Sequence, residues 1–258
     1  MLKALIFDVD GTLADTGDGH RVAFNEAFAE AGLDWYWDVR RYGDLLRVTG
    51  GKERIRQFLS EDRPDLLRAP DIDQRIRDLH AAKTRHYLEL LKAGGIPLRS
   101  GVRRLIGEAR TAGLRLAIAT TTTPDNVITL LQTALGTDGV GWFDVIAAGD
   151  IVPAKKPAPD IFHLALKELG LPAHDCLALE DSDNGLRAAL AAGLPTVITT
   201  NEYTRGQEFP GAVAVLDGFG EPGERVTVRA GPAPASGHVD IGSLFDWHRR
   251  AVTARPGS

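Results

Sequence analysis

Two aspartates separated by a single residue follow the first apolar run of the chain, in the order Asp8-Val9-Asp10-Gly11. Side chains two residues apart on extended backbone point to the same side, so the carboxylates of Asp8 and Asp10 would lie close together. Two like charges at short range raise the pKa of one carboxyl unless a metal ion compensates them. The pair therefore suits nucleophilic and acid–base chemistry, with Asp8 as nucleophile and Asp10 as proton donor. An isolated pair of this kind is also typical of a solvated turn.

Hydroxyl and ammonium groups follow two later apolar runs. Thr120 begins a row of threonines after the run 114–119, and these hydroxyls could bind phosphate oxygens or cap the next helix. Lys156 is stiffened by Pro157 and precedes another predicted helix. Its ammonium could neutralise a phosphate and an attacking carboxylate together, or it could be an ordinary solvated lysine.

A second acidic pair, Glu180 and Asp181, ends the apolar run 176–179. Magnesium prefers oxygen ligands in octahedral geometry and retains waters, so Asp8, the Asp10 carbonyl and either acid of this pair would form a partial shell. Asp181 could also cap the helix that follows. Because all four groups follow apolar runs in one consistent order, their combination favours a single site.

The pattern of elements would bring these groups together. Apolar runs at 4–7, 114–119, 143–148, 176–179 and 195–199 alternate with predicted helices at 102–112, 126–135, 159–169 and 184–192. This alternation predicts a doubly wound, mostly parallel α/β sheet with helices on both faces. Ligands bind at the carboxyl ends of the strands in such sheets. The segment 218–238 has no periodicity and is expected to be a loop before a last helix at 241–251.

Residues 17–92 interrupt this alternation. Apolar side chains recur at helical spacing in 20–31, 52–59 and 71–92, and no alternating strand pattern intervenes. We therefore expect an inserted all-helical cap domain at 17–92. The α/β core would then consist of residues 1–16 and 93–258.

The composition excludes several other classes of protein. A chain of 258 residues with 43% hydrophobic and 25% charged side chains is typical of a globular protein with a sizeable core. Its net charge of -5 argues against a dedicated nucleic-acid binder. No uninterrupted apolar segment approaches the length of a membrane span, and the single Cys176 is typical of a buried thiol in a reducing compartment. We expect a cytoplasmic monomer with no nucleic-acid or membrane partner.

Together, these motifs resemble the four motifs of the haloacid dehalogenase superfamily. They are Asp8-Val9-Asp10-Gly11-Thr12, Thr120, Lys156 and Glu180-Asp181. The helical insertion straight after the first motif resembles the subgroup of sugar phosphatases and β-phosphoglucomutases that carry a small helical cap. Within the cap, His20–Phe28, Gly32–Trp37 and Thr49–Arg54 closely resemble the CbbY proteins. That resemblance implies a Calvin-cycle phosphatase for xylulose-1,5-bisphosphate, an inhibitor of Rubisco.

The resemblance also implies a mechanism. Asp8 would attack phosphorus to form an aspartyl phosphate, while Asp10 protonates the leaving alkoxide and later serves as base for the attacking water. Thr120 and Lys156 would hold the transferring oxygens. Magnesium would be held by Asp8, Asp10, Glu180 and Asp181 and would screen their charge.

The cap would recognise the rest of the substrate. Candidates for contacts with a distal phosphate or with sugar hydroxyls are His20, Lys52, Arg54 and Lys83. Each of these cations could instead belong to a solvated face. The other expected substrate contacts are Thr16, Gly50 and Thr121.

One stretch departs from the family pattern. Gly17 and Gly19 stand where CbbY-like proteins more usually carry acidic or larger residues. Two glycines should make the linker to the cap more flexible. We expect closure of the cap to gate the entry of water and substrate.

Four alternative functions share parts of this pattern. A haloacid dehalogenase would need neither magnesium nor Asp10, so the acids at 10, 180 and 181 count against it. A β-phosphoglucomutase would share every core residue, and only the cap favours a phosphatase over it; a phosphatase for another sugar phosphate is also open. A non-catalytic phosphosugar sensor is disfavoured because Asp8 and Asp10 are both present.

Overall fold

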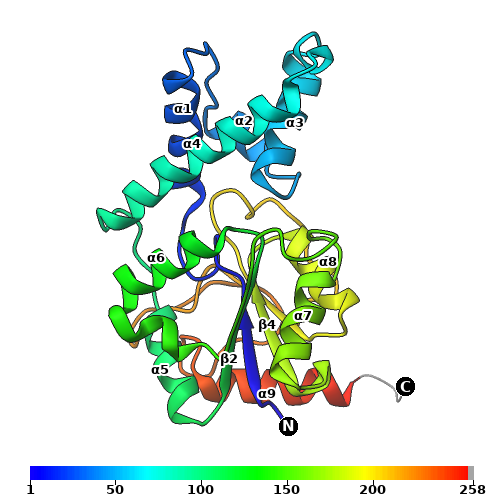
Figure 1. Cartoon of the computed structure of the whole chain (residues 1–258). Helices are drawn as coiled ribbons and strands as arrows, with labels where there is room; N and C mark the ends of the chain where they lie inside the picture. The colour runs from blue at the N-terminus through cyan, green and yellow to red at the C-terminus, as the bar shows by residue number, and fades with distance from the viewer. Residues whose placement is uncertain (255–258) are drawn as a thin grey trace.

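A seven-stranded sheet forms the centre of the computed structural model, which describes residues 1–254 (Figure 1). Its strands lie in the order β3-β2-β1-β4-β5-β6-β7, and all neighbours are parallel except β6 and β7. The strands are β1 Ala4–Phe7, β2 Arg115–Thr120, β3 Val145–Ala148, β4 Cys176–Glu180, β5 Thr196–Thr199, β6 Ala214–Leu216 and β7 Val228–Ala230. The central strand β1 is buried along its whole length.

Helices cover both faces of this sheet. One face packs against α5 Val102–Thr111, α6 Pro124–Leu135 and α9 Ile241–Thr253; the other packs against α7 Asp160–Leu169 and α8 Asp183–Ala191. Side chains alternate along β1, so that Leu5 and Phe7 enter the first cluster while Ala4 and Ile6 enter the second. The predicted doubly wound, mostly parallel α/β sheet is therefore confirmed.

Residues 17–92 form a helical insertion that lies over one end of the sheet (Figure 1). They form α1 Gly17–Glu30, α2 Val39–Leu45, α3 Gly51–Asp62 and α4 Ile72–Lys92, with a 3-10 turn at Leu66–Arg68. Aromatic side chains form their centre. The centroid of the Trp37 ring lies 4.7 Å from that of Phe24 and 4.9 Å from that of Phe28. Asn25 fixes the Trp37 backbone by donating to its carbonyl and accepting from its N–H. Among the described residues, no helix combines the length and apolarity needed to cross a membrane.

Three short elements were not predicted from the sequence: α2, β6 and β7. The prediction of loop over 218–238 is wrong at β7, a three-residue strand in which Arg229 and Ala230 are exposed. So short and open a strand has no alternation of buried and exposed positions that a sequence pattern could reveal. Residues 255–258, which belong to the expected core, lie outside the described part of the chain.

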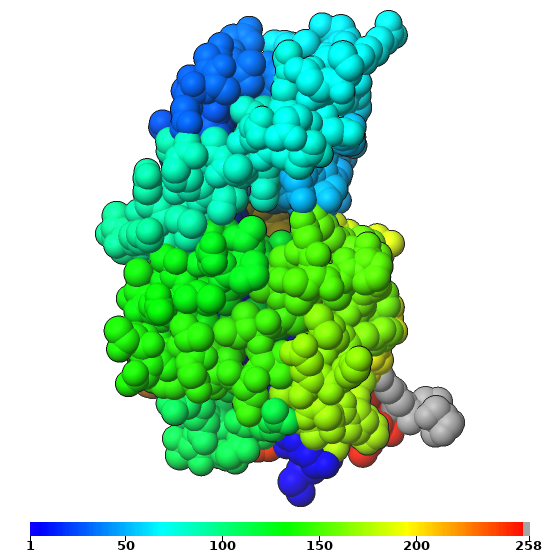
Figure 2. Space-filling view, viewed as in Figure 1, coloured from blue at the N-terminus to red at the C-terminus, as the bar shows by residue number. Residues whose placement is uncertain are grey.

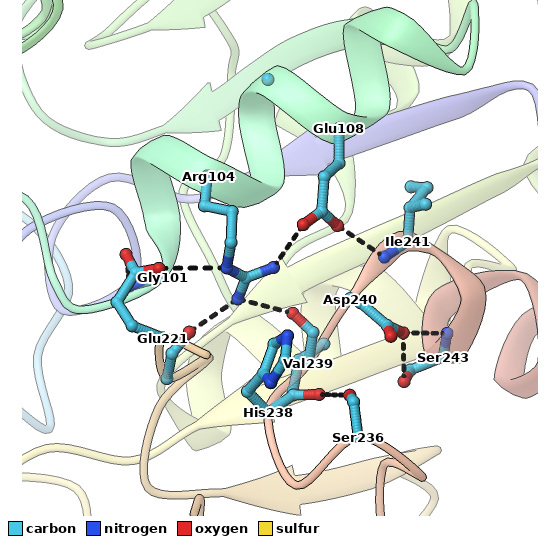
Figure 3. A network of polar contacts seen from close by, with 12 residues as sticks. Gly101, Arg104, Glu108, Glu221, Ser236, His238, Val239, Asp240, Ile241 and Ser243 are labelled. Atoms are coloured by element: carbon cyan, nitrogen blue, oxygen red, sulfur yellow. Dashed lines mark hydrogen bonds and ion pairs between the residues drawn. The ribbon is translucent and has the colours of Figure 1, made fainter. Parts of the chain in front are cut away.

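Arg104 on α5 attaches the segment between β6 and α9 to the core (Figure 3). Its guanidinium donates to the carbonyls of Gly220 and Val239 at 2.6 and 2.9 Å and pairs with Glu221 at 3.1 Å. Glu108, one turn further along α5, pairs with Arg104 and accepts from the Ile241 N–H at the start of α9. These charge-assisted bonds order a segment that has few apolar side chains.

Candidate active site

The carboxyl ends of β1 and β4 bring together four charged side chains: Asp8, Lys156, Glu180 and Asp181. These strands are neighbours with Phe7 paired to Leu179, so Asp8 and Glu180 lie side by side. The ammonium of Lys156 lies between them, 2.7 Å from Asp8 Oδ1 and 2.5 Å from Glu180 Oε1. It also donates to the Ala119 carbonyl at the end of β2, at 2.8 Å. Three strands thus supply the partners of one buried cation.

The electrostatics of this cluster favour a further positive charge. Burial raises the pKa of Asp8 to about 7, with Glu180 adding to the effect and Lys156 opposing it. Burial also raises the pKa of Asp181 well above its ordinary value. Burial lowers the pKa of Lys156, but the carboxylates of Asp8 and Glu180 outweigh burial and hold this pKa above its ordinary value. One ammonium therefore compensates only part of the charge of three carboxyl groups.

The same three carboxyl groups could hold a metal ion. Asp8, Glu180 and Asp181 each offer an oxygen, and these oxygens lie within 4.8 Å of one another. All three residues are buried. Hard oxygen donors with uncompensated negative charge fit a hard divalent cation.

Asp10 belongs to a separate chain of hydrogen bonds that enters the helical insertion. Its Oδ1 accepts from the Thr16 hydroxyl at 2.7 Å and lies 2.9 Å from His20 Nε2. Lys83 Nζ on α4 lies 2.8 Å from His20 Nδ1. Since an ammonium can only donate, His20 Nδ1 accepts from Lys83 and Nε2–H donates to Asp10. The arrangement links Asp10 to a lysine 73 positions away along the chain.

The pKa values along this chain follow from burial and from neighbouring charges. Burial and the nearby Lys83 lower the pKa of His20 to about 4, so the imidazole is neutral at pH 7. Burial alone would raise the pKa of Asp10, but His20, Thr16 and Lys83 lower it to about 2. Attraction to His20 is the largest of the lowering influences on Asp10, and the hydrogen bond from His20 adds to it. Burial lowers the pKa of Lys83 to about 7, against the attraction of Asp10.

A cavity of about 850 Å³ lies between this end of the sheet and the helical insertion. The space-filling view shows a hollow along the boundary between the two parts (Figure 2). The predicted site residues that line the cavity are Asp8, Asp10, Thr16, His20, Gly50, Lys52, Arg54, Lys83, Thr121, Lys156, Glu180 and Asp181. Thr120 is buried beside the cavity, where its hydroxyl accepts from the Thr122 N–H at 3.3 Å.

Two further predicted substrate contacts, Lys52 and Arg54, also have protein partners. Lys52 Nζ lies 2.6 Å from Asp150 Oδ2, so this cation is paired across the boundary between the helical insertion and the core. Arg54 donates to the Tyr42 hydroxyl and to the Val48 carbonyl, both at 3.3 Å, and its guanidinium lies over the Tyr42 ring. Both still line the cavity, but neither is an unpaired surface cation.

Other residues of the site were missed. Asp150 follows β3, and Asn201 follows β5 by two residues; both line the cavity. The rule that ligands gather at the carboxyl ends of parallel strands could have found both, because both strands were predicted. Tyr203 also lines the cavity, and no sequence signal points to it.

Comparison with known proteins identifies the family. The family model for haloacid dehalogenase-like hydrolases matches residues 2–193, which is most of the chain. The chain belongs to this family. The resemblance deduced from the four motifs is therefore confirmed, as is the assignment of the protein to the hydrolases.

Relatives within the family include CbbY proteins. The plasmid CbbY protein of Cupriavidus necator is 51% identical over 247 residues, which cover 96% of this chain and 97% of that protein. A crystal structure of a CbbY variant from Rhodobacter sphaeroides in complex with xylulose-1,5-bisphosphate is 51% identical, with a TM-score of 0.80. That match covers 86% of this chain and 97% of the other. A β-phosphoglucomutase from Clostridium difficile, 19% identical with a TM-score of 0.74 over 98% of this chain and 100% of its own, shares the fold.

Proposed function

We propose that this hydrolase is a magnesium-dependent phosphatase that converts xylulose-1,5-bisphosphate to xylulose-5-phosphate through an aspartyl-phosphate intermediate. The observation that carries the proposal is the buried cluster of Asp8, Lys156, Glu180 and Asp181 at the base of the cavity. The bisphosphate bound by the Rhodobacter sphaeroides relative supports the choice of substrate.

The first step would transfer the phosphoryl group to the enzyme. A carboxylate oxygen of Asp8 attacks phosphorus, the bond from phosphorus to the sugar oxygen breaks, and Asp10 gives a proton to the leaving alkoxide. Lys156 holds Asp8 at 2.7 Å and is placed to attract the phosphate oxygens as well. The hydroxyl of Thr120 would help to position those oxygens, together with Thr121 at the cavity wall.

The second step would release phosphate. Asp10, now a carboxylate, takes a proton from water as the water attacks phosphorus, and Asp8 leaves with its electron pair. The present contacts of Asp10 with Thr16 and His20 favour this ionised form. For the acid step Asp10 must carry a proton, so we infer that bound substrate changes these contacts.

The metal would be magnesium, held by the carboxylates of Asp8, Glu180 and Asp181 with the Asp10 carbonyl. Bound there, it would supply a Lewis acid that withdraws charge from the reacting phosphate. Lys156 would compensate the remaining charge of Asp8 and Glu180.

The helical insertion would act as a cap on the core formed by 1–16 and 93–258, and would select the substrate. Lys52, Arg54 and Gly50 line the cavity on the cap side, where a second phosphate would require positive charge. His20 and Lys83 would contact sugar hydroxyls beside Asp10. We also infer that the enzyme acts as a monomer in the cytoplasm, on a small sugar phosphate rather than on a nucleic acid or a membrane.

Phosphate release from a panel of substrates tests this function. The panel compares xylulose-1,5-bisphosphate, ribulose-1,5-bisphosphate, fructose-1,6-bisphosphate and glucose-1-phosphate, with magnesium and with EDTA. We expect the highest kcat/KM on xylulose-1,5-bisphosphate and no turnover in EDTA. Equal rates on all four substrates would overturn the substrate assignment. Isomerisation of a sugar phosphate without free phosphate would instead identify a mutase.

A further inference from the structure

Asn201 connects the acidic cluster to a rigid turn of the core. Its Nδ2 donates to Asp181 Oδ2 at 2.7 Å, so it holds one of the three carboxylates of the candidate metal site. Its Oδ1 accepts from the backbone N–H groups of Tyr203 and Thr204, at 2.9 and 3.2 Å. The Thr204 hydroxyl in turn accepts from the Asn201 N–H at 3.0 Å. One amide side chain therefore fixes both Asp181 and the turn 201–204.

The turn carries Tyr203 into the aromatic cluster of the cap. The Tyr203 ring meets that of Tyr42 edge-on, with centroids 5.6 Å apart and an interplanar angle of 81°. Although Tyr203 belongs to the core, it packs on the cap cluster that contains Phe24, Trp37 and Tyr42. An edge-to-face contact of this kind is favourable only at short range, so it exists only while the cap is closed over the core.

Gly17 in the first turn of α1 provides the space for this ring. A Cβ built on Gly17 would lie 2.6 Å from the Tyr203 ring, closer than real contacts allow. Gly17 has an ordinary helical backbone, so an alanine there would be penalised by the ring and not by its own conformation. Gly17 thus serves a close approach between cap and core as well as any flexibility of the linker.

Other contacts across the boundary are of two kinds. Ala23, Tyr87 and Leu91 of the cap pack into the main apolar cluster of the core, and several polar pairs lie nearer the surface. Lys52 and Asp150 form a pair in which the side chains are 37% and 50% exposed, and pairs of this kind contribute little to stability. Tyr203 differs from both kinds because it is joined to Asp181 through Asn201.

From this geometry we propose that the turn 201–204 couples the metal site to closure of the cap, with Asn201 and Tyr203 as its two positioning residues. A cation that orders Asp181 would order Asn201 and hence the turn that presents Tyr203 to the cap. By linkage, a closed cap would raise the affinity for the cation by the same factor. The proposal rests on the proposed function only in assigning a divalent cation to the acidic cluster.

Cap position and metal affinity test the coupling without using turnover. Spin labels on cysteines introduced at exposed positions 65 in the cap and 167 in the core would report the distance between the two parts. Mg²⁺ affinity would be measured on the same proteins by calorimetry. The set comprises the unsubstituted enzyme, Tyr203→Ala, Tyr203→Phe, Asn201→Ala and Gly17→Ala. The matched controls are Val39→Ala, at an exposed cap position, and Gly107→Ala, a helical glycine with open space around it.

We expect Mg²⁺ to shift the unsubstituted enzyme toward the shorter distance. Tyr203→Ala, Gly17→Ala and Asn201→Ala should lose this shift and weaken Mg²⁺ binding by about fivefold or more, the lower end of coupling between sites. Tyr203→Phe keeps the ring and should behave like the unsubstituted enzyme, as should both controls. If Tyr203→Ala and Gly17→Ala bind Mg²⁺ normally, or if Mg²⁺ leaves the cap position unchanged, the coupling is overturned. Failure of Mg²⁺ to bind any of the proteins would instead count against the metal in the proposed function.

Discussion

At the scale of single residues, Lys83 is the buried charge with the clearest consequence for pH. This residue is 5% exposed, and burial lowers its pKa to about 7 from an ordinary 10.5. Between pH 7 and pH 10.5 the Lys83 side chain is protonated in the unfolded chain and neutral in the folded protein, so raising the pH favours the folded state. Relative to Lys83→Met, the free energy of unfolding should therefore rise from pH 7 to pH 9, by up to about 1.4 kcal/mol per pH unit.

Urea denaturation of the two proteins at several pH values measures this difference. Lys92→Met replaces an exposed lysine at the end of the same helix and serves as the control. A difference between the enzyme and Lys83→Met that stays flat, or that falls with pH, would mean that Lys83 keeps its ordinary pKa.

The central charged residues could be predicted because their positions follow from topology. Asp8, Lys156 and Glu180 were proposed from strand ends, and parallel strands bring their carboxyl ends to one edge. The partners of Lys52 could not be predicted, because its pairing with Asp150 depends on how the cap lies over the core. Asn201 was accessible to the same strand-end argument, because it lies two residues beyond the predicted run 195–199.

At the scale of elements, Trp37 organises the cap. It is fully buried, and its ring is surrounded by those of Phe24, Phe28, Tyr42 and Phe58. Truncation to alanine should destabilise the cap by about 3–5 kcal/mol, because it removes this packing and leaves a cavity. Hydrogen exchange should speed up in α1 to α4 and much less in the sheet. Trp37→Phe retains most of the side-chain volume and should lose far less stability. An equal loss of hydrogen-exchange protection in the cap and in the sheet would contradict an independent cap cluster.

Most helices and buried strands were predictable, whereas α2, β6 and β7 were not. Helices such as α4 present several turns of one apolar face, and buried strands such as β4 present a continuous apolar run. The elements α2, β6 and β7 have seven residues or fewer, and their placement depends on tertiary contacts. Gly17 and Gly19 were interpreted as a flexible linker, whereas the structure places both in the first turn of α1 and close to other side chains.

At the scale of the whole molecule, the boundary between cap and core carries a network of charges. Asp150 accepts from Lys52 of the cap at 2.6 Å and from Lys155 of the core at 2.8 Å, and Lys155 also pairs with Glu53 at 2.8 Å. A distal phosphate that binds Lys52 must compete with Asp150 for it. Asp150→Asn should therefore lower KM for xylulose-1,5-bisphosphate by about threefold, with kcat unchanged, since a weak exposed ion pair is removed.

Steady-state kinetics at low ionic strength would measure this change. Asp138→Asn, at an exposed position on the core, controls for the loss of one negative charge. A KM that rises or stays constant in Asp150→Asn would show that Lys52 does not bind the substrate.

Trapping the covalent intermediate tests the chemistry most directly. Enzyme quenched during turnover of xylulose-1,5-bisphosphate with magnesium would be treated with borohydride, which reduces an aspartyl phosphate to homoserine, and then mapped by mass spectrometry. We expect homoserine at position 8, and none there in Asp8→Asn or without substrate. Homoserine at another aspartate, or turnover with no reducible acyl phosphate at position 8, would contradict phosphoryl transfer through Asp8.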